Sequence, residues 1–195
     1  SNFIKGLRVT EKQTIKVVED VLIEFNKEIV KSLEKHNCNS QSINSRENNI
    51  IIAVKDSDEL GFVGSPTDID KLTIDKIIDE KKVPVIAPLG LSLENQTYNI
   101  NADTAAGSIA KKLKARRLII MSDVEGVLDS NGKLIPEINS DSIKNLIENE
   151  TITGGMIPKI NNCLDVASNG VKGVVIIDGR KNHSVLFELL SDEGS

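Results

Sequence analysis

The stretch Arg117-Leu-Ile-Ile-Met-Ser-Asp-Val-Glu-Gly-Val127 predicts a buried strand that ends in a polar loop. Short apolar runs bounded by turn residues are typical of strands that are covered on both faces. Apolar runs of the same kind occur at residues 50–54 and 83–88, and residues 102–114 have the spacing of a helix. Because such strands alternate with helices, the sequence predicts an α/β fold: a three-layer α/β/α sandwich with a mostly parallel central sheet.

The remaining elements are predicted from the same two patterns, which are short apolar runs for strands and apolar residues at helical spacing for helices. We expect helices at residues 13–35, 68–80, 140–148, 155–168 and 182–190, and a last strand at residues 173–177. Asp68 is the expected cap of the second helix. The polar segment 36–49 and the Gly- and Pro-containing segment 61–66 are expected to be loops. No repeat or linker interrupts the pattern, so we expect a single domain over residues 1–195.

Composition excludes several functional classes. The 195 residues carry a formal net charge of -5, which does not attract nucleic acid or an anionic membrane surface to the chain as a whole. No apolar stretch is as long as a membrane span. Two cysteines are too few for a disulfide framework, so a reducing compartment is expected.

The segment Thr153-Gly154-Gly155-Met156-Ile157-Pro158-Lys159 is the first candidate for chemistry. Glycines allow backbone amides to approach a ligand, a helix N-terminus favours anions, and Lys159 adds a positive charge. The pattern therefore favours phosphate, although a plain helix-entry turn with a solvated lysine has the same residues.

Three weaker candidates lie in predicted loops. Asn99, Asn101 and Asp103 meet the start of a helix, where they can orient a polar substrate or simply cap the helix. Asp123 and Gly126 follow a strand end, which suits a nucleotide or a plain turn. Arg8 has the donors to hold a carboxylate, but a single arginine is also common on surfaces.

Taken in order, six blocks resemble one family: 6–10 (GLRVT), 84–88 (PVIAP), 99–103 (NINAD), 122–127 (SDVEGV), 154–159 (GGMIPK) and 177–180 (IDGR). The chain resembles the acetylglutamate kinases of the amino acid kinase family, from Phe3 to about Gly194. The resemblance implies transfer of the γ-phosphoryl group of ATP to the side-chain carboxylate of N-acetyl-L-glutamate, in arginine biosynthesis.

The resemblance also implies roles for individual residues. It makes Lys159 and Asp103 catalytic, and Arg8 and Asn99 binding residues for N-acetyl-L-glutamate. It implies that Mg²⁺ enters with ATP, held mainly through the phosphates, and that no protein residue is a dedicated metal ligand. The implied nucleotide-binding positions are Asp123, Val124, Glu125, Gly126, Val127, Leu128, Ile152, Thr153, Gly155 and Met156.

Part of the family pattern has no counterpart here. Two glycine-rich loops and a second lysine precede the matching region in that family, so we expect this chain to correspond to the C-terminal portion and to be inactive by itself. Residues 1–90 then resemble the rest of a substrate-binding and dimerisation lobe, and residues 91–195 a nucleotide-binding lobe. A homo-oligomer in the cytoplasm is expected, with a plastid or mitochondrial origin left open.

Two alternatives remain open from the sequence. One is a catalytically silent module that binds nucleotide or dimerises. The other is a different amino acid kinase, although the GLRVT and NINAD blocks together favour N-acetyl-L-glutamate as the acceptor.

Overall fold

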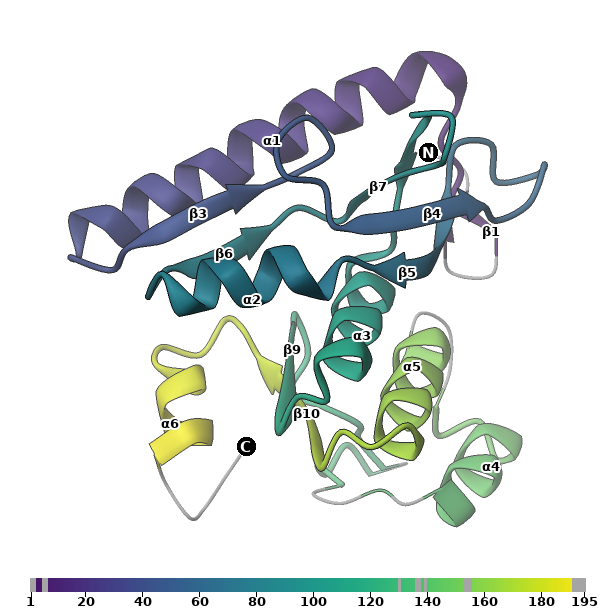
Figure 1. Ribbon diagram of the computed structural model, residues 1–195. Helices are drawn as coiled ribbons and strands as arrows, with labels where there is room; N and C mark the ends of the chain where they lie inside the picture. The colour runs from purple at the N-terminus through teal and green to yellow at the C-terminus, as the bar shows by residue number, and fades with distance from the viewer. Residues whose placement is uncertain are drawn as a thin grey trace. The chain divides into compact units, whose positions relative to one another are not determined.

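The computed structural model describes residues 3–4, 7–129, 131–135, 138, 140–152 and 156–190. The chain divides into two compact units, Ser1–Leu113 and Lys114–Ser195. Each unit contains parallel strands connected through helices (Figure 1). None of the described helices combines the length and apolar composition that crossing a bilayer requires.

The first unit contains three described sheets and three helices. In chain order its elements are β1 (Phe3–Ile4), β2 (Leu7–Arg8), α1 (Lys12–Lys35), β3 (Ser40–Ile43), β4 (Ile51–Lys55), β5 (Gly64–Ile69), α2 (Lys71–Asp79), β6 (Val83–Ile86), β7 (Leu89–Leu91), β8 (Thr97–Asn99) and α3 (Ala102–Leu113). The largest sheet has the order β5-β4-β7-β8, with β4 and β7 parallel and both outer pairs antiparallel. β3 pairs with β6 in parallel, and β1 with β2 antiparallel.

The core of the first unit lies between its strands and α2 and α3. It is built mainly of isoleucine: Ile43, Ile50, Ile51, Ile69, Ile74, Ile77 and Ile100. Full burial of such a side chain contributes about 1.5–3 kcal/mol. Ile43, Ile51 and Ile69 lie in strands, which β-branched residues favour, so these three residues form the strands and also pack them against the helices.

The second unit is organised around one parallel pair of strands. Its described elements are β9 (Arg117–Ser122), α4 (Ser140–Glu148), α5 (Met156–Ser168), β10 (Gly173–Asp178) and α6 (Ser184–Leu190). The register runs from Arg117 opposite Gly173 to Ser122 opposite Asp178. Both strands therefore end at the same edge, which is where loops of α/β folds present functional groups.

The α/β fold class predicted from the sequence is confirmed. The parallel pairs are β3/β6, β4/β7 and β9/β10, and the antiparallel pairs are β1/β2, β4/β5 and β7/β8. Most predicted helices agree with the structure within two residues.

The prediction of a loop over residues 36–49 was wrong, because the polar side chains of this segment are not all exposed to solvent. Segment 36–49 contains strand β3, whose Ser42 donates a hydrogen bond to Asn26 Oδ1 of α1 over 2.6 Å. Asn26 is buried and also donates to Val85 O over 2.8 Å. The polar strand side chains are thus satisfied by a polar face of the helix.

The prediction of a loop at residues 61–66 was also wrong, and the helix after it begins later than predicted. Gly64 and Pro66 belong to β5, where an added Cβ at Gly64 would lie 2.6 Å from Tyr98 Cβ. A register shift between Ile52 and Ala53 accommodates the extra residue of the β5 strand. The helix begins after Asp70, whose carboxylate caps it by accepting from Thr73 N over 3.2 Å, so Asp68 is not the cap.

The two compact units divide between residues 113 and 114, while the lobe boundary at 90/91 that the resemblance implies stays a prediction. The reason for the division at 113/114 is local pairing: β7 and β8 extend the sheet of β4, and α3 packs against β5. The assignment of substrate and nucleotide roles to the two lobes remains a prediction.

Candidate active site

The first unit brings Arg8 and Asn99 together through a third residue, Thr10. Asn99 Nδ2 donates a hydrogen bond to Thr10 Oγ1 over 3.1 Å, across 89 positions of sequence. Thr10 is fully buried and stands two positions after Arg8. Thr10 thus links the Asn99 side chain to the backbone beside Arg8, and we call these three residues the acceptor cluster: Arg8, Thr10 and Asn99.

A tight turn at residues 60–62 holds the acceptor cluster in place. Thr10 N donates to Leu60 O over 3.1 Å, and Phe62 N donates to Thr10 O over 2.7 Å. Asn99 N donates to Phe62 O over 2.9 Å. Gly61 makes this approach possible, because its φ is +69° and an added Cβ would lie 2.4 Å from Thr10 O.

Arg8 is exposed and its guanidinium stacks on an aromatic ring. The Arg8 Cζ atom lies 5.5 Å from the centroid of the Phe3 ring. Stacking engages the face of the guanidinium and leaves its N–H groups, which lie in the plane, directed outward. This arrangement suits bidentate donation to a carboxylate.

The start of α3 carries Asn101 and Asp103 in different roles. Asn101 caps the helix, since its Oδ1 accepts from Thr104 N over 3.1 Å. Asp103 is half-buried in the first turn, where a negative charge is favourable. The capping role that the sequence allowed for Asp103 is therefore filled by Asn101.

In the second unit, the ends of β9 and β10 are joined by a set of polar contacts. Gly179 N donates to Ser122 O over 2.8 Å. Arg180 donates to both carboxylate oxygens of the buried Asp178 over 2.9 Å. These donors lower the pKa of Asp178 to about 2, and the carboxylate in turn raises the pKa of Arg180.

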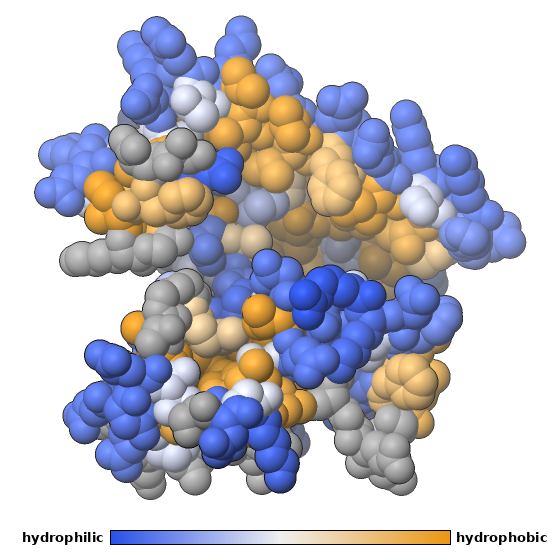
Figure 2. Space-filling model, turned by 180° about the vertical axis from the view of Figure 1, so that it is seen from behind, coloured by the Kyte–Doolittle hydropathy of each residue, from blue (hydrophilic) through white to orange (hydrophobic). Residues whose placement is uncertain are grey.

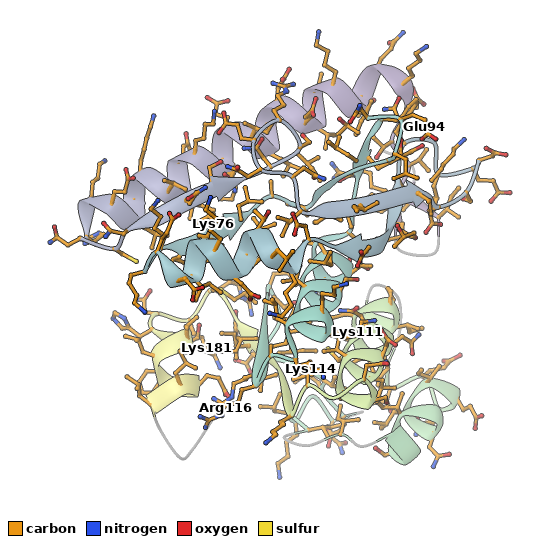
Figure 3. All side chains as sticks on the ribbon, viewed as in Figure 1. Lys76, Glu94, Lys111, Lys114, Arg116 and Lys181 are labelled. Atoms are coloured by element: carbon orange, nitrogen blue, oxygen red, sulfur yellow. The ribbon has the colours of Figure 1, made fainter. Side chains whose placement is uncertain are left out.

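The predicted nucleotide segment 123–128 lies against this pair. Glu125 forms an ion pair with Lys181 over 3.0 Å, and Lys181 is labelled in Figure 3. Gly126 has a φ of +140°, and an added Cβ would lie 2.8 Å from Leu134 Cδ1. The segment is therefore a turn that requires glycine at position 126. We call Asp178, Arg180, Glu125 and Lys181 the ionic cluster.

Not every predicted nucleotide position presents its side chain to solvent. Val127 and Ile152 are 6% and 1% exposed and belong to a core cluster with Ile143 and Ile160. Met156 packs against the same cluster. These positions can contact a ligand mainly through their backbone groups.

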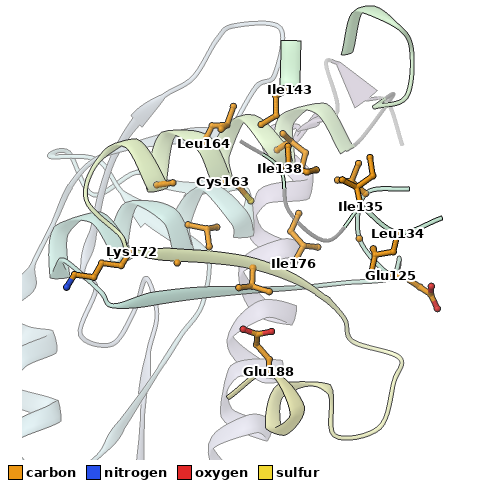
Figure 4. A pocket seen from close by; sticks show the side chains of 17 residues that line it. Glu125, Leu134, Ile135, Ile138, Ile143, Cys163, Leu164, Lys172, Ile176 and Glu188 are labelled. Carbon is orange, nitrogen blue, oxygen red and sulfur yellow. The ribbon is translucent and has the colours of Figure 1, made fainter. Parts of the chain in front are cut away.

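The second unit contains a cavity of about 690 Å³ along β10 and α5 (Figure 4). Its lining is mixed: it includes the apolar residues Ile138, Ile143 and Leu164 and the charged residues Lys172 and Glu188. Glu125, Gly126 and Val127 also line it, so the cavity meets the predicted nucleotide segment at one end. The cavity therefore offers both apolar contacts and charged groups to a ligand.

Lys159 is half-buried and is the fourth residue of α5. Thr153 and Gly155, which precede α5, lie outside the described residues. Asp103 belongs to the first unit and Lys159 to the second, and the expectation that their side chains converge remains a prediction. Within the part of the chain that the structure describes, no group of three or more His, Cys, Asp or Glu residues is arranged to hold a metal ion.

Sequence reasoning missed Thr10 and Asp178 as members of these clusters. Thr10 has no local signal, because its partner is 89 positions away. The Asp178–Arg180 pair had one, since an Asp followed two residues later by Arg after a strand can form a local ion pair.

The sequence matches the amino acid kinase family over residues 1–178. The chain therefore belongs to the amino acid kinase family. It is 70% identical to the acetylglutamate kinase of Pelagibacter ubique (strain HTCC1062), over 100% of this chain and 68% of that protein.

Two solved structures share the fold. The smu.665 protein of Streptococcus mutans UA159 is 35% identical, with a TM-score of 0.85 over 91% of this chain and 73% of that one. The carbamate kinase of Giardia lamblia bound to AMP-PNP is 16% identical, with a TM-score of 0.59 over 82% of this chain and 64% of that one. The second likeness concerns the fold alone.

Proposed function

We propose that the protein transfers the γ-phosphoryl group of ATP to the side-chain carboxylate of N-acetyl-L-glutamate, which forms N-acetylglutamyl 5-phosphate in arginine biosynthesis. The observation that carries the proposal is the 70% identity, over the whole chain, with a protein named acetylglutamate kinase. The acceptor cluster adds a chemical argument, because it combines a cationic donor with a carboxamide.

The reaction needs positioning more than acid–base chemistry. An ordinary glutamate carboxylate has a pKa near 4.3, so it is already deprotonated at neutral pH and attacks without a general base. The main tasks are to align acceptor and donor and to neutralise charge on the transferring phosphoryl group. In the proposal, Arg8 and Asn99 hold the acceptor, and Lys159 faces the developing charge.

ATP brings Mg²⁺, which supplies charge neutralisation at the phosphates when bound. Three features of this segment suit a bound nucleotide: the turn at Gly126, the carboxylate of Asp123 and the apolar residues beside Val127. Asp103 is proposed to orient the catalytic lysine. Asp103 lies in the first turn of α3, where the helix dipole favours a negative charge.

The test is a hydroxamate assay, which traps the acyl phosphate that ATP and the acceptor form. In a protein that also carries the two glycine-rich loops and the second lysine of the family, we expect product with N-acetyl-L-glutamate and none with L-aspartate, which is the acceptor of another amino acid kinase. Product with L-aspartate alone would overturn the proposed acceptor. Binding of ATP without any phosphoryl transfer would support the silent module instead.

We also propose that the protein is a homo-oligomer through the exposed face of α1. Val17, Val21 and Phe25 recur every four residues and are 60%, 56% and 57% exposed. Figure 2 shows apolar side chains gathered along this helix. A contiguous apolar stripe of this kind is typical of an interface.

Light scattering with the Phe25→Glu variant tests this face. We expect the variant to lower the oligomer mass to that of a monomer. Leu72→Glu is the matched control, since Leu72 is an isolated apolar residue of α2 that is 80% exposed. Equal masses for wild type and Phe25→Glu would exclude α1 as the interface. A cytoplasmic location also remains part of the proposal.

A further inference from the structure

We propose that Thr10 is a positioning residue for the acceptor: its buried hydroxyl holds the Asn99 carboxamide in the orientation that binds N-acetyl-L-glutamate. This inference rests on the proposed function, because it concerns the same acceptor. None of the sequence motifs predicted this role.

The position of the Thr10 hydroxyl is determined by the backbone around it. Thr10 N donates to Leu60 O and Thr10 O accepts from Phe62 N, over 3.1 and 2.7 Å. The residue is 0% exposed, so neighbouring atoms also limit its side chain. Its hydroxyl is directed toward Arg8 O, 3.4 Å away, and accepts from Asn99 Nδ2.

The bond to Thr10 selects one orientation of the Asn99 amide. A carboxamide has two N–H donors and one oxygen that accepts. A flip of the amide plane would bring Asn99 Oδ1 to Thr10 Oγ1, and the hydroxyl would have to turn its proton away from Arg8 O to keep a hydrogen bond. With one N–H used by Thr10, the second N–H and Oδ1 are presented together to the acceptor.

The main chain of Asn99 is held by the same turn that holds Thr10. Asn99 N donates to Phe62 O over 2.9 Å, while Phe62 N donates to Thr10 O. Side chain and backbone thus form a closed ring of hydrogen bonds through Thr10, Phe62 and Asn99. Such a ring keeps a binding group within the small tolerance that recognition requires.

The chain offers a matched control on the same strand. Thr97 Oγ1 of β8 donates to Glu19 Oε1 of α1 over 3.0 Å. This hydroxyl connects the same strand to the helix that follows Thr10, but it has no bond to Asn99. A purely structural role of the threonine hydroxyls would make the two positions behave alike.

The experiment compares Thr10→Val, Thr10→Ser and Thr97→Val by calorimetric binding of N-acetyl-L-glutamate. Thr10→Val keeps the side-chain shape and removes the hydroxyl, so we expect affinity to fall by about tenfold. Thr10→Ser keeps the oxygen and should bind as wild type does. Thr97→Val should lower the melting temperature and leave the affinity unchanged.

A second measurement works on the wild-type chain without ligand. The side-chain amide protons of Asn99 should exchange with solvent more slowly than those of the exposed Asn95, and Thr10→Val should remove the difference. This NMR readout remains decisive if Thr10→Val folds poorly, because the wild-type comparison needs no variant.

The outcomes distinguish the identity of the acceptor from the role of Thr10. Slow exchange at Asn99 with binding of a different acylated amino acid would overturn the acceptor and keep the role of Thr10. Binding of N-acetyl-L-glutamate that Thr10→Val leaves unchanged would overturn the role of Thr10 alone. Equal exchange at Asn99 and Asn95 would also overturn it.

Discussion

In the first unit, Arg8, Thr10 and Asn99 are arranged by neutral hydrogen bonds around a hydroxyl that water does not reach. In the second unit, Asp178, Arg180, Glu125 and Lys181 are joined by ion pairs whose cations are 63% and 60% exposed. The first cluster joins segments far apart in sequence, whereas the Asp178–Arg180 pair is local.

Because of this difference, we expect the two clusters to respond differently to changes in geometry, salt and pH. Buried neutral hydrogen bonds lose stability when geometry changes and respond little to salt or pH. Exposed ion pairs contribute little, are screened by salt and depend on the ionisation of the carboxylate. Shape therefore controls the acceptor cluster, and charge controls the ionic cluster.

The largest expected effect is on kcat, and it distinguishes a catalytic residue of the second unit from a binding residue of the first. In a protein that also carries the two glycine-rich loops, Lys159→Ala should lower kcat by about 10²–10³-fold, because a cation that meets developing charge acts in the chemical step. Arg8→Ala should mainly raise the KM for N-acetyl-L-glutamate, because it holds a carboxylate in the ground state and in the transition state. Steady-state kinetics in the hydroxamate assay measures both.

Lys31→Ala is the control, since Lys31 is an exposed lysine of α1 to which no catalytic or substrate-binding role is assigned. Its kinetic constants should equal those of wild type. A raised KM for Lys159→Ala with unchanged kcat would reverse the roles of the two residues.

Gly61→Ala tests whether shape controls the acceptor cluster. Its Cβ would lie 2.4 Å from Thr10 O, so we expect a loss of about 2 kcal/mol or more in the free energy of unfolding by urea. Gly132→Ala is matched in backbone conformation, with a φ of +78° and no atom within 4 Å of the added Cβ. It should cost about 1 kcal/mol; equal losses at the two positions would mean that the Thr10 contact adds nothing.

Asp178 tests whether charge controls the ionic cluster. The hydrogen bonds from Arg180 lower its pKa from 3.8 to about 2, so the folded state favours the ionised carboxylate. The stabilisation is fully present above the ordinary pKa and is lost as the pH falls from about 4 toward 2. The melting temperature of wild type should fall more steeply in this range than that of Asp178→Asn.

The exposed carboxylate of Asp58 is the comparison for that experiment, since its side chain is 98% exposed. Asp58→Asn should leave the slope of the acid transition close to that of wild type. Parallel acid profiles for wild type and Asp178→Asn would show that the buried carboxylate is not the group that titrates.

The smallest expected effect concerns Lys181 and Glu125. Their side chains are 60% and 49% exposed, so Lys181→Met should change the free energy of unfolding by less than about 0.5 kcal/mol. The change should disappear at about 1 M salt, where the screening length is near 3 Å. A larger change in the free energy of unfolding that persists in salt would show that this ion pair stabilises the fold as the buried contacts do.

Part of the fold and of the site could be predicted without coordinates. The apolar run of β9 and the helical spacing of α1 and α3 lie within single segments, so their periods were sufficient. Arg8, Asn99 and Gly126 were named because each carries its chemistry in its own residue type. The polar strand β3 could not be found this way, because Asn26 satisfies its side chains from another element.

By itself, then, the sequence determined the α/β class and the order of most elements, since these depend on local periodicity and on residue type. The family and the roles of the candidate residues came from the resemblance of the six sequence blocks. The tertiary structure decided which of the candidates meet. Thr10 became part of the acceptor cluster only when the chain brought Asn99 back across 89 positions and Gly61 allowed the turn to approach. A hydrogen bond between distant segments leaves no pattern in either segment, because its geometry exists only in the folded chain.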